Sequence, residues 1–130
     1  MIGLDTDAVI GFFRKDPELI QLMESLKEDI TSTIINYQEI IFGLDFQNKK
    51  HLEEKDFFDS FFNDIDILNL DKESCNKANE IFWDLGKKGT CPGKFDCMIA
   101  GIFLANGVNK IITRNTKHFE NIPGLKVISY

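Results

Sequence analysis

Five short apolar or β-branched segments alternate with stretches of helical periodicity, and this alternation constrains the fold more than any other feature of the chain. The segments are predicted to be strands, and they cover residues 2–4, 30–33, 65–68, 110–113 and 125–128. Strands separated by helices typically form parallel sheets with helices packed on both faces. We therefore expect an α/β protein with three layers, α/β/α, around a central and mainly parallel sheet.

Helical periodicity fills the intervals between these strands. The predicted helices cover residues 8–13, 51–63 and 95–105, and a further helix lies around Glu39. Asp16-Pro17-Glu18 starts another helix, and Asp71 is the expected cap of a long helix that ends near Gly86. Thr6 or Asp7 is the expected N-cap of the first helix, because both side chains can accept a hydrogen bond from the free backbone N–H groups there. Asp7 is the simpler choice, which leaves Asp5 available for another role.

Length and composition indicate one domain, residues 1–130. No apolar run approaches the roughly 20 residues of a membrane span, and no export signal is visible, so we expect a cytoplasmic protein without a membrane partner. Three cysteines, an odd number, are typical of a reduced interior. A net charge of −6 argues against a protein that coats nucleic acid.

Four acidic or amide residues lie next to or within apolar segments, where a polar side chain is costly unless it is paired or binds a metal. Asp5 and Asn115 each follow a predicted strand, whereas Glu39 and Asp96 lie in mostly apolar helices, near starts that could return to the same sheet edge. Ligands of parallel α/β sheets collect at the carboxyl ends of the strands. If the fold gathers these oxygen atoms, they form a site for a hard cation.

Each of these residues also has a structural interpretation. Asp96 could complement the dipole of its helix, Glu39 could be a solvated residue at the edge of an apolar face, and Asn115 could be a turn or cap residue. The basic residues near the two C-terminal candidates could form ordinary surface or a rim that orients a phosphodiester. They include Lys94, Arg114, Lys117 and His118.

Other motifs have less support. The segment 89–95 resembles a phosphate loop but is one residue short and lacks the Ser or Thr after Lys94. Asp5-Thr6-Asp7 fits the start of a phosphatase with Asp5 as nucleophile, yet no later strand ends in paired acids. Cys91 and Cys97 lack the paired spacing of a zinc site. The helix with Phe57, Phe58, Phe61 and Phe62 can pack into the core, and any aromatic excess would mark a dimer or partner interface.

Taken together, four segments resemble PIN-domain ribonucleases, and most closely the VapC-type toxins of prokaryotic toxin–antitoxin pairs. They are Leu4-Asp5-Thr6-Asp7, Gln38-Glu39, Asp96-Cys97-Met98-Ile99-Ala100 and Thr113-Arg114-Asn115-Thr116-Lys117-His118-Phe119. The resemblance spans essentially the whole chain, in the right order.

The resemblance implies a parallel α/β/α fold in which Asp5, Glu39 and Asp96 bind the metal. Asn115 matches a position that often holds a fourth Asp, and Asp7 is peripheral. It also implies a homodimer and a small antitoxin. We therefore expect an endoribonuclease that depends on Mg²⁺ or Mn²⁺ and cleaves RNA through a cation-activated water. The alternative is a PIN-like RNA-binding or scaffold domain without catalysis.

Overall fold

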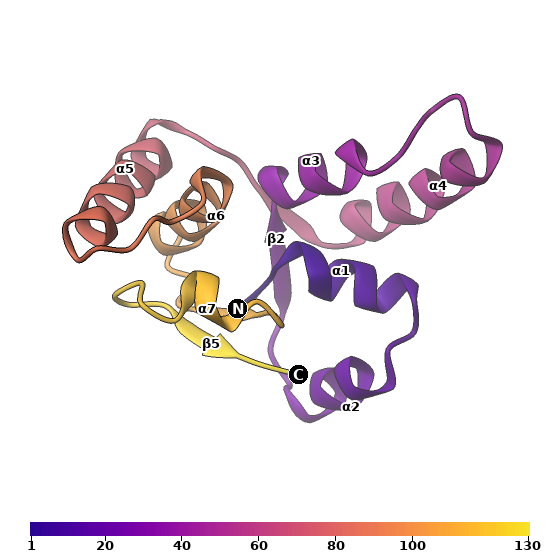
Figure 1. Cartoon of the computed structure of the whole chain (residues 1–130). Coiled ribbons are helices and arrows are strands. Elements are labelled where there is room, and N and C mark those ends of the chain that lie inside the picture. The colour runs from indigo at the N-terminus through magenta and orange to yellow at the C-terminus, as the bar shows by residue number, and fades with distance from the viewer.

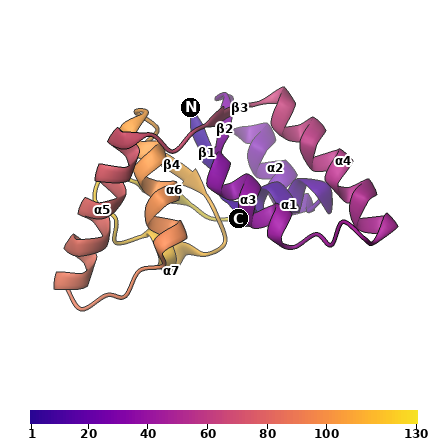
Figure 2. The same cartoon turned by 90° about the horizontal axis from the view of Figure 1, so that it is seen from above.

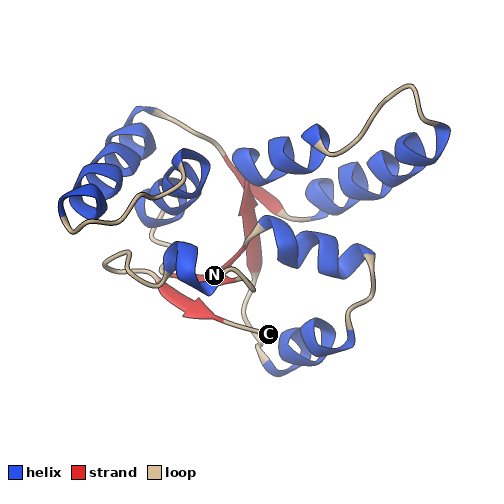
Figure 3. Ribbon diagram, in the orientation of Figure 1, coloured by secondary structure: helices blue, strands red, loops and turns tan.

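A five-stranded parallel sheet organises the computed structural model, which describes residues 1–130 (Figure 3). The strand order is β3-β2-β1-β4-β5, and all four pairings are parallel. This confirms the predicted α/β class and the five predicted strands, with boundaries that differ by at most one residue. The strands are β1 (Ile2–Leu4), β2 (Ile30–Thr33), β3 (Asp66–Leu68), β4 (Lys110–Ile112) and β5 (Lys126–Ile128).

Helices cover both faces of the sheet, as the two perpendicular views show (Figures 1 and 2). On one side lie α1 (Thr6–Phe13), α2 (Pro17–Ser25), α3 (Ile34–Phe42) and α4 (Lys49–Asp64). On the other side lie α5 (Lys72–Lys87) and α6 (Lys94–Ala105), followed by the short α7 (Thr116–Phe119). None of the helices is long and apolar enough to cross a membrane.

The central strand β1 is buried on both faces, so its side chains alternate between two cores. Ile2 and Leu4 belong to the cluster under α1, α2 and α4. Gly3 faces the opposite layer, where an added Cβ would lie 2.5 Å from Cζ of Phe103 in α6. The strand therefore needs a residue without a side chain at this position, and the Phe103 ring occupies the space instead.

The predicted helix cap Asp71 is confirmed, and the cap predicted for the first helix is wrong. Asp16 and Asp71 cap α2 and α5, and their side chains accept hydrogen bonds from backbone N–H groups in the first turn. The N-cap of α1 is Asp5, not Thr6 or Asp7, and its side chain makes no cap hydrogen bond. The helix starts directly after β1, so both expected caps lie within its first turn.

The phenylalanine-rich helix α4 is divided between core and surface. Phe58 and Phe62 are buried, whereas Phe57 is 38% exposed and contacts Phe13 of α1, with ring centroids 5.0 Å apart. Further aromatic side chains are exposed elsewhere. They are Phe42, Phe46, Trp83 and Phe95.

The close packing of α5 against α6 gives a test of this architecture. An added Cβ at Gly101 would lie 2.7 Å from the backbone nitrogen of Ala78, which cannot move aside, so Gly101→Ala should destabilise the protein by about 1–3 kcal/mol. Gly86→Ala is the matched control. An added Cβ there meets nothing within 4 Å, and it should stabilise α5 by about 0.5–1 kcal/mol. Urea unfolding measures both, and equal stability of the two variants would contradict this packing.

Candidate functional site

The carboxyl ends of the three central strands carry the polar residues of the candidate site. Asp5 follows β1, Thr113 follows β4, and Thr33 ends β2. Parallel pairing places these positions side by side at one edge of the sheet, because Leu4 pairs with Ile112 and β1 also pairs with β2. The site therefore begins where the sequence analysis expected it, at the carboxyl edge.

Asp5 is the most deeply buried acid at this edge, with 4% of its surface exposed. Its Oδ2 accepts a hydrogen bond of 2.8 Å from the Thr113 hydroxyl, and its Oδ1 accepts one of 3.2 Å from Nδ2 of Asn36. Each carboxylate oxygen is thus oriented by a donor from a different neighbouring strand or helix. These donors lie 108 and 31 residues away along the chain.

Asn36 is fully buried and links Asp5 to the start of α3. Its Oδ1 accepts hydrogen bonds from the hydroxyl and the backbone N–H of Thr33, at 2.7 and 3.2 Å. Its Nδ2 donates to the Thr6 hydroxyl as well as to Asp5. Because both Oδ1 and Nδ2 of Asn36 are hydrogen-bonded, the side-chain amide is held in one orientation and donates to the Asp5 carboxylate from a fixed position.

Glu39 reaches the same cluster from the middle of α3. It is the sixth of nine helical residues, so it lies further from the helix start than the sequence suggested. Its Oε1 accepts a hydrogen bond of 2.7 Å from Thr6, the residue that also receives the Asn36 amide. A continuous chain of hydrogen bonds therefore joins Asp5 to Glu39 through Asn36 and Thr6.

Asp96 lies in the first turn of α6, on the other side of the edge. Its Oδ2 lies 3.0 Å from Nδ1 of His118 in α7. An added Cβ at the N-cap Gly93 would come within 3.0 Å of the same oxygen, so the absence of a side chain there leaves the carboxylate room. Gly93 makes no side-chain cap, which leaves Asp96 as the acidic group at the α6 N-terminus.

Burial and mutual repulsion raise the pKa values of these acids. Burial raises the pKa of Asp5 to about 7, against the opposing Thr113 hydrogen bond, and the charges of Asp7 and Asp96 raise it further. Burial also raises the pKa of Glu39, with Asp96 and Asp7 adding to the shift. Burial raises the pKa of Asp96, and His118 partly offsets this. The acids are thus close enough to disfavour one another's charge.

The side chains as they stand do not form a closed metal centre. No three His, Cys, Asp or Glu side chains lie close enough together to hold one metal ion. The chemistry of the donors nevertheless suits a divalent cation, because all the candidate ligands are oxygen atoms. In addition, Oδ1 of Asp7 is buried without any hydrogen-bond partner. A cation would relieve the repulsion that raises the acid pKa values.

Asp7 has a different role from the helix cap that the sequence suggested. Its Oδ2 accepts a hydrogen bond of 2.9 Å from the backbone N–H of Arg114 and lies 3.3 Å from the Thr113 hydroxyl. The Arg114 side chain lies 2.6 Å from Asp16 and stacks over the ring of Tyr130 at 4.6 Å. These contacts tie the loop after β4 to the helices α1 and α2.

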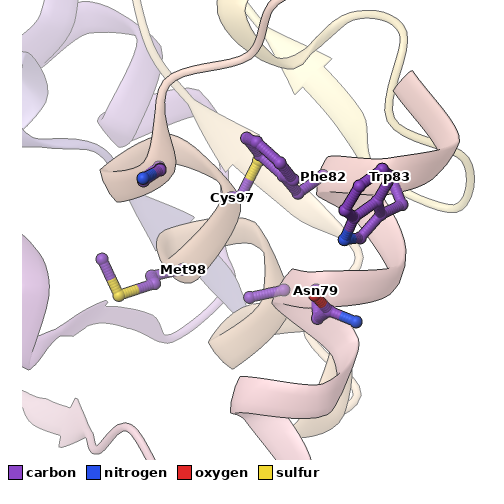
Figure 4. A pocket seen from close by; sticks show the side chains of 7 residues that line it. Asn79, Phe82, Trp83, Cys97 and Met98 are labelled. Atoms are coloured by element: carbon purple, nitrogen blue, oxygen red, sulfur yellow. The ribbon is translucent and has the colours of Figure 1, made fainter. Parts of the chain in front are cut away.

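The four basic residues of the expected rim lie in three different places. Arg114 is engaged by Asp16 and Tyr130. Lys94 lines a cavity of about 320 Å³ between α5 and α6, together with the mainly apolar side chains in Figure 4. Lys117 and His118 lie beside Asp96, on the wall of a smaller cavity. Of the four, Lys117 and His118 line a cavity together with one of the candidate acids, Asp96.

Asn115 occupies the N-cap position of α7, but its side chain caps nothing. Its backbone N–H donates 3.0 Å to the Thr113 hydroxyl, and its side-chain amide makes no hydrogen bond within the protein. The turn interpretation therefore accounts for its backbone and leaves the amide free to contact a ligand.

The roles of Thr113, Asn36 and Thr6, which hold Asp5 and Glu39 in place, were not predicted from the sequence. One signal was present for Asn36, because Thr33 and Asn36 form a capping box and have the spacing of that motif. Thr113 begins one of the segments that resemble PIN-domain ribonucleases, but no pattern predicted its bond to Asp5, since it follows β4 as an ordinary β-branched residue.

The raised pKa of Asp5 predicts a pH-dependent stability. The folded protein keeps the Asp5 proton up to about pH 7, whereas the unfolded chain loses it near 3.8. Stability of the metal-free protein should therefore fall as pH rises through this window, by at most about 1.4 kcal/mol per pH unit. Asp5→Asn should remove this contribution. Urea unfolding in EDTA between pH 4 and pH 8 measures it, and parallel curves for the two proteins would contradict the burial of an ionisable Asp5.

The contact between Asp7 and Arg114 predicts a local change in hydrogen exchange. Asp7→Ala removes the acceptor, so the backbone amide of Arg114 should exchange faster with solvent. Asp7→Asn is the matched control, because its amide oxygen can still accept that hydrogen bond, and it should retain most of the protection. Amide exchange followed by NMR measures both. Unchanged protection of Arg114 in Asp7→Ala would show that the loop is held by other contacts.

Comparison with known proteins agrees with this geometry. Residues 2–125 match the family model of the PIN domain. The tRNA(fMet)-specific endonuclease VapC of Salmonella typhimurium strain LT2 is 28% identical over 127 residues, which cover 95% of this chain and 93% of that protein. A protein of the same description from Shigella flexneri is also 28% identical, over 95% of this chain and 92% of that protein.

Two solved structures resemble this chain in three dimensions. The crystal structure of VapBC2 from Rickettsia felis, bound to a DNA fragment from their promoter, contains a chain that superposes with a TM-score of 0.85 and 25% identity, over 100% of this chain and 99% of that chain. VapBC-1 from nontypeable Haemophilus influenzae gives a TM-score of 0.82, at 24% identity over 99% and 98% of the two chains. The chain therefore belongs to the PIN-domain family.

Proposed function

We propose that this protein is a cytoplasmic, metal-dependent endoribonuclease, a single PIN domain that acts as the toxin of a toxin–antitoxin pair. The observation that carries the proposal is the group of repelling acids at the carboxyl edge of the sheet, in a chain whose relatives are named endonucleases. The named substrate of those relatives favours structured RNA, such as a tRNA, as the substrate class.

Asp5, Glu39 and Asp96 would hold the divalent cation, Mg²⁺ or Mn²⁺. A bound cation would lower the pKa of a coordinated water and stabilise charge on the scissile phosphate. Thr113 and Asn36 fix the direction of the Asp5 oxygens, and Thr6 orients Glu39. These hydrogen bonds hold the carboxylates in place before a metal ion binds, so the carboxylates lose little conformational entropy on binding it.

His118 and the nearby amide of Asn115 complete the proposed site. His118 holds Asp96 Oδ2 and can face a phosphate from the same position. Asn115 would position water or substrate through its free side chain, without adding a charge. Lys117, which forms no ion pair, would contact the RNA backbone.

The proposed partner is a small antitoxin, as in the toxin–antitoxin complexes among the structural neighbours. Glu39 lines a cavity of about 260 Å³ together with Phe13 and Leu44, so an apolar segment could reach the acids from α1 and α4. The exposed Phe57 lies beside Phe13. We also propose a homodimer, in which other exposed aromatic side chains would be covered.

A cleavage assay with matched carboxylate variants tests this function. Glu39→Gln should lower kcat/KM on RNA by more than the roughly 10- to 100-fold cost of losing an outer-shell partner of a metal. Glu28→Gln is the control, because Glu28 pairs with Lys110 at the opposite end of β4, and it should leave cleavage unchanged. Purified tRNA with Mg²⁺ or Mn²⁺, and with EDTA, provides the readout. Equal activity in the two variants, or full activity in EDTA, would reject the mechanism.

Metal-linked stability provides a readout that does not depend on catalysis. A cation that binds only the folded protein stabilises it by roughly 2.7 kcal/mol at a hundredfold excess over Kd. Asp96→Asn removes one repelling charge, so it should raise the melting temperature in EDTA and reduce the Mn²⁺-induced increase. An undiminished Mn²⁺ effect would remove Asp96 from the site. Wild-type protein that neither cleaves RNA nor responds to Mn²⁺ would instead support the non-catalytic PIN-like domain.

A further inference from the structure

The smaller cavity lined by Lys117 and His118 lies directly beside Asp96. Its volume is about 180 Å³. Its walls are formed by the segment between α5 and α6, by the first turn of α6, and by α7 together with Asn121, which follows α7. Asp96 and His118 form part of its wall, so the cavity is continuous with the proposed site. The remaining lining residues are Leu85, Thr90, Cys91, Pro92, Gly93, Lys117 and Asn121.

The wall formed by the segment between α5 and α6 is held by backbone contacts. The N–H of Thr90 donates to the carbonyl of Leu85 at 3.0 Å, and the N–H of Gly89 donates to Gly86 at 3.1 Å. Gly89 adopts a φ of 81°, a left-handed conformation that suits glycine. These backbone contacts hold the turn after α5 in the conformation that places Thr90 at the cavity.

Three polar side chains at this cavity have hydrogen-bonding capacity to spare. Thr90, Lys117 and Asn121 line it, and none of them forms a side-chain hydrogen bond or ion pair within the protein. Asn121 and Thr90 can both donate and accept, as recognition of a base edge requires, whereas Lys117 provides a positive charge. Leu85 and Pro92 add apolar surface, against which the face of a flat ring can pack.

We propose that this cavity binds one unpaired nucleotide of the RNA substrate, with its base between Thr90 and Asn121 and its phosphate near Lys117. The inference rests on the proposed nuclease function and adds a recognition site to it. A volume of about 180 Å³ is below the roughly 300–1,000 Å³ of typical small-molecule sites, so the cavity suits a single base. Proteins read RNA sequence mainly from bases splayed out of loops and single strands.

The basic residues support this position for the RNA. Arg114 is engaged by Asp16 and Tyr130, and Lys94 lines the apolar cavity between α5 and α6. Lys117 is the basic side chain that combines a place beside Asp96 with no ion-pair partner. A strand that crosses the acids would therefore continue over α7 and the turn after α5.

Cysteine footprinting tests the cavity independently of cleavage. Cys91 lines the cavity and is exposed, whereas Cys75 is exposed near the start of α5, and Cys97 is buried. The inactive Glu39→Gln protein would be alkylated with iodoacetamide, with and without purified tRNA in Mg²⁺, and mass spectrometry would quantify each thiol. RNA should slow alkylation of Cys91 and leave Cys75 unaffected.

Variants of the lining residues provide a second measurement. Asn121→Leu and Thr90→Val should each lower kcat/KM by roughly two- to tenfold, the value of one lost hydrogen bond, mainly through KM. They should also weaken the preference for the base at one position next to the cut, which sequencing of RNA ends reveals. Asn109→Leu is the matched control, because Asn109 lies before β4, at the opposite end of that strand.

The outcomes separate this inference from the function on which it rests. Cleavage by the wild type with equal alkylation of Cys91 in free and RNA-bound protein would overturn the nucleotide site and leave the nuclease intact. Equal protection of Cys91 and Cys75 would also overturn it, since it would reflect general coverage. Wild-type protein that does not cleave RNA would overturn both.

Discussion

The buried carboxylate of Asp5 is the group on which the rest of the candidate site depends. An acid in this position loses its hydration, and its side-chain hydrogen bonds to Thr113 and Asn36 partly compensate for that loss. Those two bonds join the ends of β4 and α3 to the end of β1. The same arrangement that makes Asp5 costly to ionise therefore ties the ends of β1 and β4 to the start of α3, and Asn36 and Thr6 connect Asp5 to Glu39.

The residues around Asp5 hold its two hydrogen-bond donors in position. Asn36 is satisfied by Thr33 on one side, so its amide always points to Asp5 and Thr6. Asp7 holds the loop that carries Thr113 through its bond to the Arg114 backbone. The consequence is a rigid first half of the site, from β1, β2 and β4, and a second half around Asp96 that is attached through α6 and α7.

Much of the fold could be predicted from sequence because its signals are local. β-branched segments and helical periodicity located the five strands and all helices except α7, whose four residues are too few to show a period. Asp96 was identifiable because it opens an apolar stretch, residues 96–105, that carries no other charge. The position of Asp5 directly after a strand, in a parallel α/β pattern, was sufficient to place it at the carboxyl edge.

The remaining features depend on contacts between distant segments. Whether Asp5 or Asp7 begins α1 is decided by where β1 stops pairing with β4, which no local pattern records. The engagement of Arg114 by Asp16 and Tyr130 could not be read from the charges alone, so Arg114 was expected to contact RNA. Similarly, helical spacing alone did not divide the phenylalanines of α4 between core and surface: Phe58 and Phe62 are buried, whereas Phe57 is exposed.

The sheet order has a further consequence for when the site can exist during synthesis. β1 lies between β2 and β4, so Asp5 gains its Thr113 partner only after nearly nine-tenths of the chain has been made. Contacts of such long sequence separation form late, because loop closure must precede them. A ribosome-bound fragment that ends before β4 already contains Asp5, Glu39 and Asp96 but lacks Thr113, which orients Asp5. The order of strands thus delays assembly of the acids until the C-terminal third of the chain has folded.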